Sequence, residues 1–355
     1  MIRKPLTLAL ILATTTAAAA PLPLADNIPA DKDGVLTYIG KESKTTAPLA
    51  LTLKPEGGAT VAIIPQGGKA TALISDGKGH TLVANHFGLT GWAQPVTAAD
   101  DNDDFPALEK SELREGETSL FNLHYLPTLG KATRETYYLD ENGKQHQGTP
   151  PEGKPEEATP YHEVYDHLLD TVLKAGGATY RIDCSTGMSD DYYCLFQHAD
   201  AARTGAPALR GRDYYLPGNG YVYTDYDDSG SSYYRKRQKW ALDGKAFKEI
   251  AQPYYYLGLD STYHGGYENK NATLTLTDDS GKKVATLKAG DKLTLLLADA
   301  GYDCPEGARI GNENDPICTE ARLLIKTADG TLGWLLLDYS KGDAPSIDGL
   351  HPLAG

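Results

Sequence analysis

The most constraining feature of this chain is an internal repeat. Residues 51–74 can be laid without a gap on residues 274–297, and ten of the 24 pairs are identical, where about one or two would arise by chance. The likeness resumes at GLTGW (88–92) and GTLGW (330–334). Self-similarity of this kind indicates one structural unit used twice. The sequence therefore predicts two copies of a small module around a central insert.

Both copies read as short strands joined by glycine-rich turns. Apolar or β-branched runs of four to six residues, separated by Gly-Gly, Asp-Gly and similar pairs, are typical of β-strands. The predicted strands are 59–64, 69–74, 81–85 and 89–94 in the first copy, and 274–277, 283–287, 292–297, 322–327 and 331–336 in the second. The second copy also carries an insertion that holds Cys304 and Cys318.

The second copy contains V-A-x-L-x-x-G-x-K-L-T-L-L, followed by L-I-K-T-A-D-G-T-L-G-W. This turn-rich unit with its final Gly-Trp pair resembles the bacterial Src-homology-3-like domain of exported proteins, over residues 36–95 and 254–338. The resemblance implies two small β-barrels that bind cell-wall peptides, peptidoglycan bridges or other proteins. It supplies no catalytic residues.

Four repeated aromatic residues are the candidate ligand-binding residues. We expect one groove near Tyr38 and Trp92 and a second near Tyr256 and Trp334. Aromatic faces stack on sugars and grip peptides. The alternative is structural, with each Gly-Trp strand sealing its own barrel.

The insert between the copies is predicted to be β-rich with one helix. Residues 98–106 (AADDNDDFP) are acidic and poor in apolar residues, as expected for a linker. Thr159-Pro160 is a typical helix start, and the apolar residues that follow recur at helical spacing up to Gly176-Gly177. Two hairpins are also expected, one from 119–125 and 134–139 and one from 179–184 and 192–197.

The predicted fold class is thus mainly β with an α+β insert, namely two small Src-homology-3-like β-barrels flanking a β-rich central domain with one helix. The expected domain ranges are a signal peptide (1–20), a first module (26–97), a central domain (98–253), a second module (254–340) and a C-terminal tail (341–355).

The N-terminus has the order of a secretory signal. Arg3 and Lys4 precede an apolar run too short to span a bilayer, and small residues follow up to Ala20. We expect cleavage, no membrane anchor afterwards, and a periplasmic or secreted protein.

The formal charge is −14 at pH 7, and an acidic surface disfavours nucleic acid as a partner.

Four cysteines in an exported chain indicate two disulfides, with three connectivities open. Proximity in the sequence favours Cys184 with Cys194 and Cys304 with Cys318. A nucleophilic cysteine is the alternative, and it would need an activating histidine.

No catalytic residue, metal site or cofactor is predicted. His162 and His167 are five residues apart, which on a helix separates them too widely for one metal, so we expect a solvated helix face. Asp225, Asp227 and Ser229 partly match a calcium loop but are explained by a hairpin turn. Arg235, Lys236, Arg237 and Lys239 are expected to pair with carboxylates across that hairpin.

Three functions remain open from the sequence. The first is an exported, non-catalytic protein that binds a peptidoglycan peptide or a protein partner. The second is a peptidoglycan-active enzyme with its site in the central domain. The third is a secreted inhibitor of a hydrolase that acts through the loop between Cys304 and Cys318.

Overall fold

The structure is a computed structural model, and it describes most of the chain. The described residues are 22–26, 34–97, 103, 105–140, 142–150, 163–186, 192–199, 205–226, 233–302, 309–312, 315–339 and 344–350. They form 27 strands and no helix, so the fold is all-β. Accordingly, no helix in this part of the chain could cross a membrane. The predicted signal peptide lies outside the described residues.

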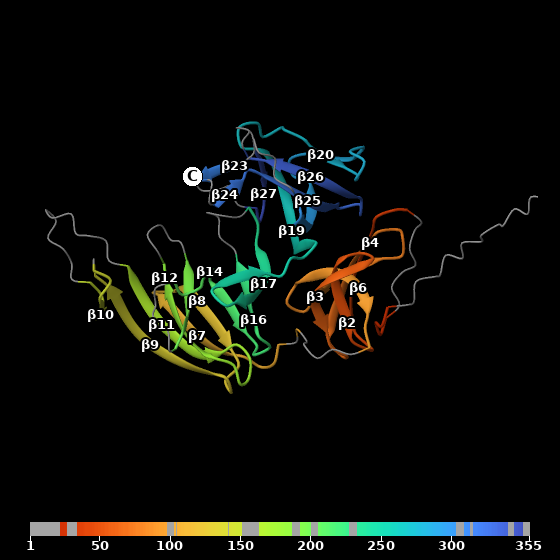
Figure 1. Ribbon diagram of the computed structural model, residues 1–355. Helices are drawn as coiled ribbons and strands as arrows, with labels where there is room; N and C mark the ends of the chain where they lie inside the picture. The colour runs from red at the N-terminus through yellow and green to blue at the C-terminus, as the bar shows by residue number, and fades with distance from the viewer. Residues whose placement is uncertain are drawn as a thin grey trace, which may run out of the picture.

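The first repeat copy folds into a six-stranded antiparallel sheet in the order β1-β4-β5-β6-β2-β3. It is drawn in red to orange in Figure 1. Its strands are β1 (Thr37–Lys44), β2 (Leu49–Lys54), β3 (Gly57–Ile64), β4 (Lys69–Ser75), β5 (Thr81–Asn85) and β6 (Thr90–Pro95).

The second copy has the same topology. Its sheet runs β21-β20-β26-β25-β22-β19-β27, so that, read from β19 to β21, each strand stands where its counterpart stands in the first copy. The strands are β19 (Tyr254–Gly266), β20 (Leu274–Thr277), β21 (Lys283–Leu287), β22 (Lys292–Asp299), β25 (Glu320–Thr327), β26 (Leu332–Asp338) and β27 (Pro345–Ile347). The insertion adds a two-stranded sheet of β23 (Arg309–Asn312) and β24 (Asp315–Cys318).

Both copies are open sheets, and a closed barrel is not seen in the described part of the chain. Even their irregularities match, because the register shifts between Tyr38 and Lys41 in β1 and between Tyr256 and Leu259 in β19. The repeated sequence thus encodes a repeated strand order, bulges included.

The insert folds into two sheets that face each other across one core, which we call the central sandwich (yellow to green in Figure 1). One sheet has the order β10-β9-β11-β12-β13-β14 and the other β18-β17-β16-β15-β8-β7. The strands are β7 (Glu109–Glu115), β8 (Thr118–Tyr125), β9 (Gly130–Leu139), β10 (Gln145–Gln147), β11 (Val164–Val172), β12 (Thr179–Ser185), β13 (Tyr193–His198), β14 (Ala208–Arg210), β15 (Asp213–Leu216), β16 (Tyr221–Tyr226), β17 (Lys236–Asp243) and β18 (Ala246–Glu249).

The predicted helix is wrong. Its proposed start, Thr159-Pro160, lies outside the described residues, and its apolar residues from Val164 to Val172 belong to β11, which pairs with β9 and β12. A bulge between His167 and Leu169 inserts one extra residue relative to β12, and Leu168 and Leu169 are both buried. Since β11 is buried on both faces and its alternation is broken by the bulge, its apolar positions imitate a helical period.

Two other expectations for the insert are also corrected. β8 and β9 are not a hairpin, because β8 pairs with β7 and β15, whereas β9 belongs to the opposite sheet. The described part of the acidic segment is an anchor rather than a solvated linker. Asp103 is buried, and Phe105 packs against the rings of Phe87 and Tyr223.

The predicted hairpin of β12 and β13 is confirmed. Cys184 and Cys194 face each other across it with a Cα–Cα distance of 4.0 Å and form a disulfide. Cys318 is also disulfide-bonded, and Cys304 lies outside the described residues. A disulfide is compatible with a compartment outside the reducing cytoplasm.

Candidate functional site

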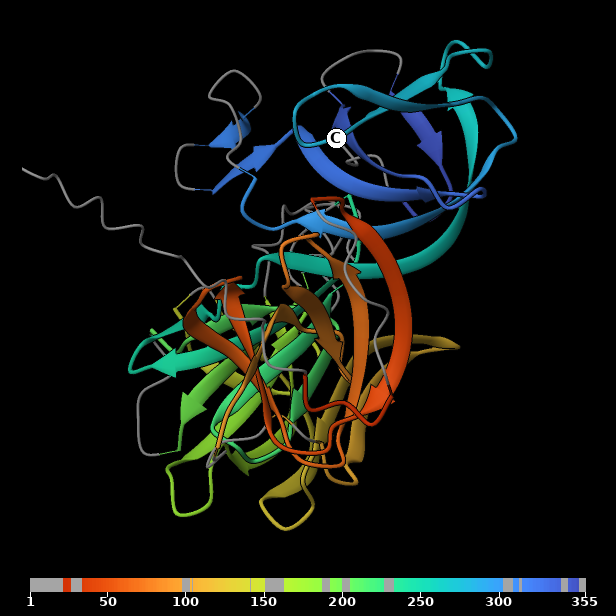
Figure 2. The ribbon, with the colours of Figure 1, turned by 90° about the vertical axis from the view of Figure 1, so that its right-hand side faces the viewer.

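The two copies pack against each other through equivalent residues. In Figures 1 and 2 the second copy, in blue, lies over both the first copy and the central sandwich. One hydrophobic cluster, which we call the junction core, spans the two copies. Eight of its nine buried members are matched pairs, namely Leu73 with Leu296, Ile74 with Leu297, Leu82 with Leu324 and Trp92 with Trp334, and the ninth is Ala84.

The Gly-Trp pairs therefore serve the contact between the copies. Trp92 is 6% exposed and Trp334 is 5% exposed. The glycine before each tryptophan permits a close strand approach, because a Cβ on Gly91 would lie 2.6 Å from Cβ of Leu51. A Cβ on Gly333 would likewise come within 2.7 Å of side-chain atoms of the neighbouring strands.

The two repeated tyrosines lie at the bulges. Gly40 and Gly258 have φ values of 61° and 59°, which a residue with a side chain rarely adopts. The ring of Tyr38 covers Gly40, and the ring of Tyr256 covers Gly258. Tyr38 remains 37% exposed, and its ring faces the second copy, with the Lys326 Nζ 4.6 Å from the ring centroid.

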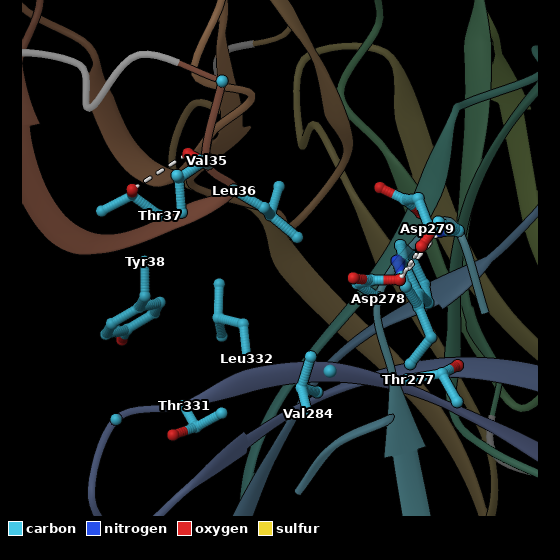
Figure 3. Close-up of a pocket in the computed structure, with 15 residues that line it drawn as sticks. Val35, Leu36, Thr37, Tyr38, Thr277, Asp278, Asp279, Val284, Thr331 and Leu332 are labelled. Atoms are coloured by element: carbon cyan, nitrogen blue, oxygen red, sulfur yellow. Dashed lines mark hydrogen bonds between the residues drawn. The ribbon is translucent and has the colours of Figure 1, made fainter. Parts of the chain in front are cut away.

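A pocket of about 810 Å³ opens between the copies. Figure 3 shows Val35, Leu36 and Tyr38 on one side of it and Val284 and Leu332 on the other. We call it the junction pocket, and its described lining is Gly34, Val35, Leu36, Thr37, Tyr38, Thr277, Asp278, Asp279, Ser280, Val284, Gly330, Thr331, Leu332, Gly333 and Trp334. Its volume lies in the usual range for small-ligand sites.

The pocket exposes apolar surface. Val35, Tyr38 and Val284 are 54%, 37% and 38% exposed, and they are half of the six large hydrophobic residues that are exposed in the described chain. Apolar side chains gathered in one hollow often mark a binding site, whereas scattered ones do not.

The polar side chains of the pocket are two carboxylates, several hydroxyl groups and one indole. Among the described residues the lining includes Asp278 and Asp279 but no lysine or arginine. Hydrogen bonds from the Ser280 side chain and the Lys282 backbone hold the pKa of Asp278 below its usual range, so it is ionised at neutral pH. The indole N–H of Trp334 is buried and has no hydrogen-bond partner among the described residues, and such an unpaired group costs free energy.

The guanidinium of Arg322 packs on the Trp334 ring and pairs with two carboxylates, one of which lines the pocket. The guanidinium of Arg322 lies 4.0 Å from the ring centroid of Trp334, and it bonds to Asp279 at 2.9 Å and to Asp299 at 3.1 Å. Because the Asp279 side chain is still 70% exposed, it remains accessible from the pocket. The lining thus suits an apolar ligand that carries a positive charge.

The four sequence-predicted residues are brought to one junction. Tyr38 and Trp334 line the same pocket although they were assigned to different grooves, and Trp92 and Tyr256 belong to the junction core without lining the pocket. Val35, Val284 and the two aspartates were missed. Val284 is one of the identical residues of the repeat, the two aspartates lie in the turn before β21, and Val35 precedes β1, but none of these positions by itself indicates a pocket.

The remaining sequence candidates do not line the junction pocket. Arg235 and Arg237 pair with Asp225 as expected, while Asp227, Ser229 and His162 lie outside the described residues. No cluster of three or more potential metal ligands occurs among the described side chains.

His167 is buried, so the expected solvated helix face is wrong. Its Nδ1 lies 3.0 Å from Oδ1 of Asp183, and its Nε2 lies 3.4 Å from Oδ2 of Asp170. Arg181 and the hydroxyl of Tyr137 also bond to Asp183. Burial lowers the pKa of His167, but the bond to Asp183 and the two negative charges outweigh burial and the repulsion of Arg181, so the pKa is raised overall.

The raised pKa of His167 predicts a pH-dependent stability. A histidine with a folded pKa above the unfolded value of about 6.5 stabilises fully below that pH, and this contribution is lost as the pH rises through the folded pKa. The free energy of unfolding, measured in urea from pH 6 upward, should therefore decrease. His167→Gln should flatten this dependence, while His264→Gln on the surface should keep it. An unchanged profile in His167→Gln would contradict the assignment.

Comparisons of the chain with protein-family models, with curated proteins and with solved structures find no match.

Proposed function

We propose that this is an exported, non-catalytic binding protein that holds a peptide segment, from the cell wall or from a protein partner, in the junction pocket. The observation that carries the proposal is the lining itself, where the exposed side chains of Val35, Tyr38 and Val284 lie beside two carboxylates. Apolar side chains of a bound peptide would cover Val35 and Val284.

The acidic lining further restricts the class of peptide that the pocket would bind. Asp278 and Asp279 favour a peptide with an amino or guanidinium group close to an apolar side chain. Both cell-wall stem peptides with a diamino acid and basic protein segments have this chemistry, so the experiment below has one arm for each source.

The proposal also covers the export of the protein and the family of its two repeated modules. The basic, apolar and small-residue order of the N-terminus supports export, and the Cys184–Cys194 disulfide is compatible with it. We also propose that each copy is a Src-homology-3-like module in the broad sense. The common strand order of the two copies and the Gly-Trp strand support this.

A pair of matched variants tests the junction pocket. Val35→Lys places an ammonium among the apolar lining, and its repulsion of a positively charged ligand together with its burial under that ligand should weaken retention at least about tenfold. Leu336→Lys introduces the same charge at an equally exposed position, since both residues are 54% exposed, but Leu336 does not line the pocket. The bound fraction is measured on purified sacculi in one arm and on immobilised exported proteins in the other.

We expect retention in one arm, its loss in Val35→Lys and its survival in Leu336→Lys. If the wild-type protein is retained in neither arm, or if the two variants lose retention equally, the proposed function is wrong.

A further inference from the structure

A second pocket, of about 390 Å³, lies at an end of the central sandwich, between β14 of one sheet and β16 to β18 of the other. We call it the sandwich pocket. Its described lining is Ala208, Leu209, Arg210, Tyr226, Lys236, Gln238, Trp240 and Phe247. Two of these residues are cationic and none is acidic, although the chain has 48 acidic and 34 basic residues. The charge of this lining is opposite to that of the junction pocket.

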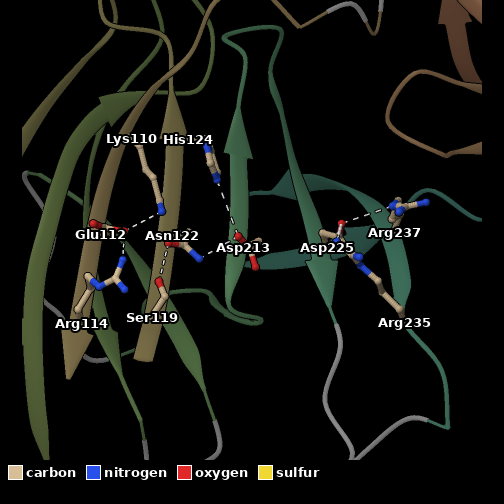
Figure 4. A network of polar contacts seen from close by, with 10 residues as sticks. All are labelled: Lys110, Glu112, Arg114, Ser119, Asn122, His124, Asp213, Asp225, Arg235 and Arg237. Carbon is tan, nitrogen blue, oxygen red and sulfur yellow. Dashed lines mark hydrogen bonds and ion pairs between the residues drawn. The ribbon is translucent and has the colours of Figure 1, made fainter. Parts of the chain in front are cut away.

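Strand alternation explains why Lys236 is in the pocket while its basic neighbours are not. Arg235 and Arg237 both pair with Asp225, as Figure 4 shows. Lys239 also belongs to the face of Arg237 and bonds to Asp103 at 2.6 Å. Lys236 points to the opposite face of β17, together with Gln238 and Trp240, because successive side chains alternate.

Lys236 lacks a carboxylate partner within the described chain. Its Nζ lies 5.6 Å and 5.7 Å from the ring centroids of Tyr234 and Tyr255, and it makes no ion pair with a described carboxylate. The nearby Glu249 is already engaged, since its two oxygens accept hydrogen bonds from Tyr255 and Gln238 at 2.9 Å and 2.8 Å. Burial lowers the pKa of Lys236, and the charge of Glu249 offsets only part of this effect.

The Lys236 side chain is half-buried, and an ammonium that is partly shielded from water attracts an anion more strongly than one in bulk water does. An anionic ligand would supply the counter-charge at Nζ. Arg210, which is exposed at the edge of the same pocket, adds to the positive potential at the entrance.

The other walls of the pocket are apolar or aromatic. Phe247 packs edge-on against Phe196 in the sandwich core, with ring centroids 4.8 Å apart. The indole N–H of Trp240 donates to Oγ1 of Thr224 at 2.9 Å, so this ring offers apolar surface rather than an unpaired donor. Leu209 completes the apolar part of the lining.

We propose that the sandwich pocket is a second binding site, independent of the junction pocket, for a small carboxylate with an apolar or aromatic body. The carboxylate contacts Lys236 Nζ, and the body packs between Trp240, Phe247 and Leu209.

The three tryptophans make this inference testable on the full-length protein. Their indole N–H signals, assigned with single Trp→Phe variants, report on separate places: Trp240 on the sandwich pocket, Trp334 on the junction pocket and Trp92 on the junction core. Benzoate and 3-phenylpropionate are titrated as probes, with benzamide and 3-phenylpropionamide as their neutral counterparts. We expect the carboxylates to shift the Trp240 signal saturably and to leave Trp92 and Trp334 unchanged, and we expect the amides to bind at least about tenfold more weakly.

Lys236→Met removes the ammonium and keeps the length of the side chain. It should weaken binding of the carboxylates at least about tenfold. Lys248→Met is the matched control, since Lys248 is exposed on β18 and does not line the pocket, and it should bind as the wild-type protein does. The unchanged spectrum of each variant away from the pocket verifies its folding. Equal binding of amides and carboxylates, no shift at Trp240, or full binding by Lys236→Met would each overturn the proposal.

Discussion

Replacing Asp103 with alanine should lower the free energy of unfolding by about 3–5 kcal/mol, because the replacement leaves the ammonium of Lys239 buried without its counter-ion. Lys239 Nζ lies 2.6 Å from Oδ1 of Asp103, and both side chains are buried. The same carboxylate accepts hydrogen bonds from the backbone N–H of Ile63, at 2.7 Å, and from the hydroxyl of Tyr223. Asp103 thus ties the first copy to the central sandwich. Urea denaturation of the full chain, followed by tryptophan fluorescence, measures the loss.

A paired replacement separates the lost ion pair from a general effect of mutation. A buried pair exchanged for apolar residues is often tolerated, so Asp103→Leu combined with Lys239→Met should be more stable than either single variant. Glu56→Ala, on the surface, should change stability by no more than about 0.5 kcal/mol. If Asp103→Ala were as mild as Glu56→Ala, Asp103 would not be the anchor described above.

Replacing Trp92 with alanine should cost about 3–5 kcal/mol, the usual range for a large aromatic residue in a well-packed core. The indole of Trp92 belongs to the junction core, which includes Leu297 and Leu324 of the second copy. Its removal should therefore loosen both copies. Hydrogen exchange should become faster in β5 and β6 and also in β22 and β25, although the substitution lies in the first copy alone.

The comparison variant for this experiment is Tyr267→Ala, which removes an aromatic ring that is 45% exposed and should leave the exchange rates of those strands unchanged. Faster exchange confined to the first copy after Trp92→Ala would mean that the copies are stable separately, which contradicts a shared core.

Local signals in the sequence predicted the repeated strands well. The limits of β21, Lys283–Leu287, agree with the prediction to the residue, because glycine-containing turns at both ends leave little freedom. The hairpin of β12 and β13 was recognised for the same reason. In contrast, the strand β11 was mistaken for a helix, because one bulge shifts the alternation and both faces are buried.

Contacts between distant residues could not be predicted. Asp103 and Lys239 are far apart in the sequence, and each alone looks like an ordinary surface charge in a charged segment. The strands β15 and β8 pair in parallel, so no hairpin turn in the sequence indicates that they are neighbours. For the junction pocket, the sequence identified Tyr38 and Trp334, but no local pattern states that one copy provides the tyrosine and the other the tryptophan.

Because the two copies pack through matched faces within one chain, their contact should not depend on protein concentration. Equivalent surfaces that pack on each other are the usual basis of a homodimer, and a homodimer separates when it is diluted. Here both halves belong to one polypeptide, so the effective concentration of one for the other is set by the tether. The junction pocket therefore persists at any dilution, and each chain presents it once.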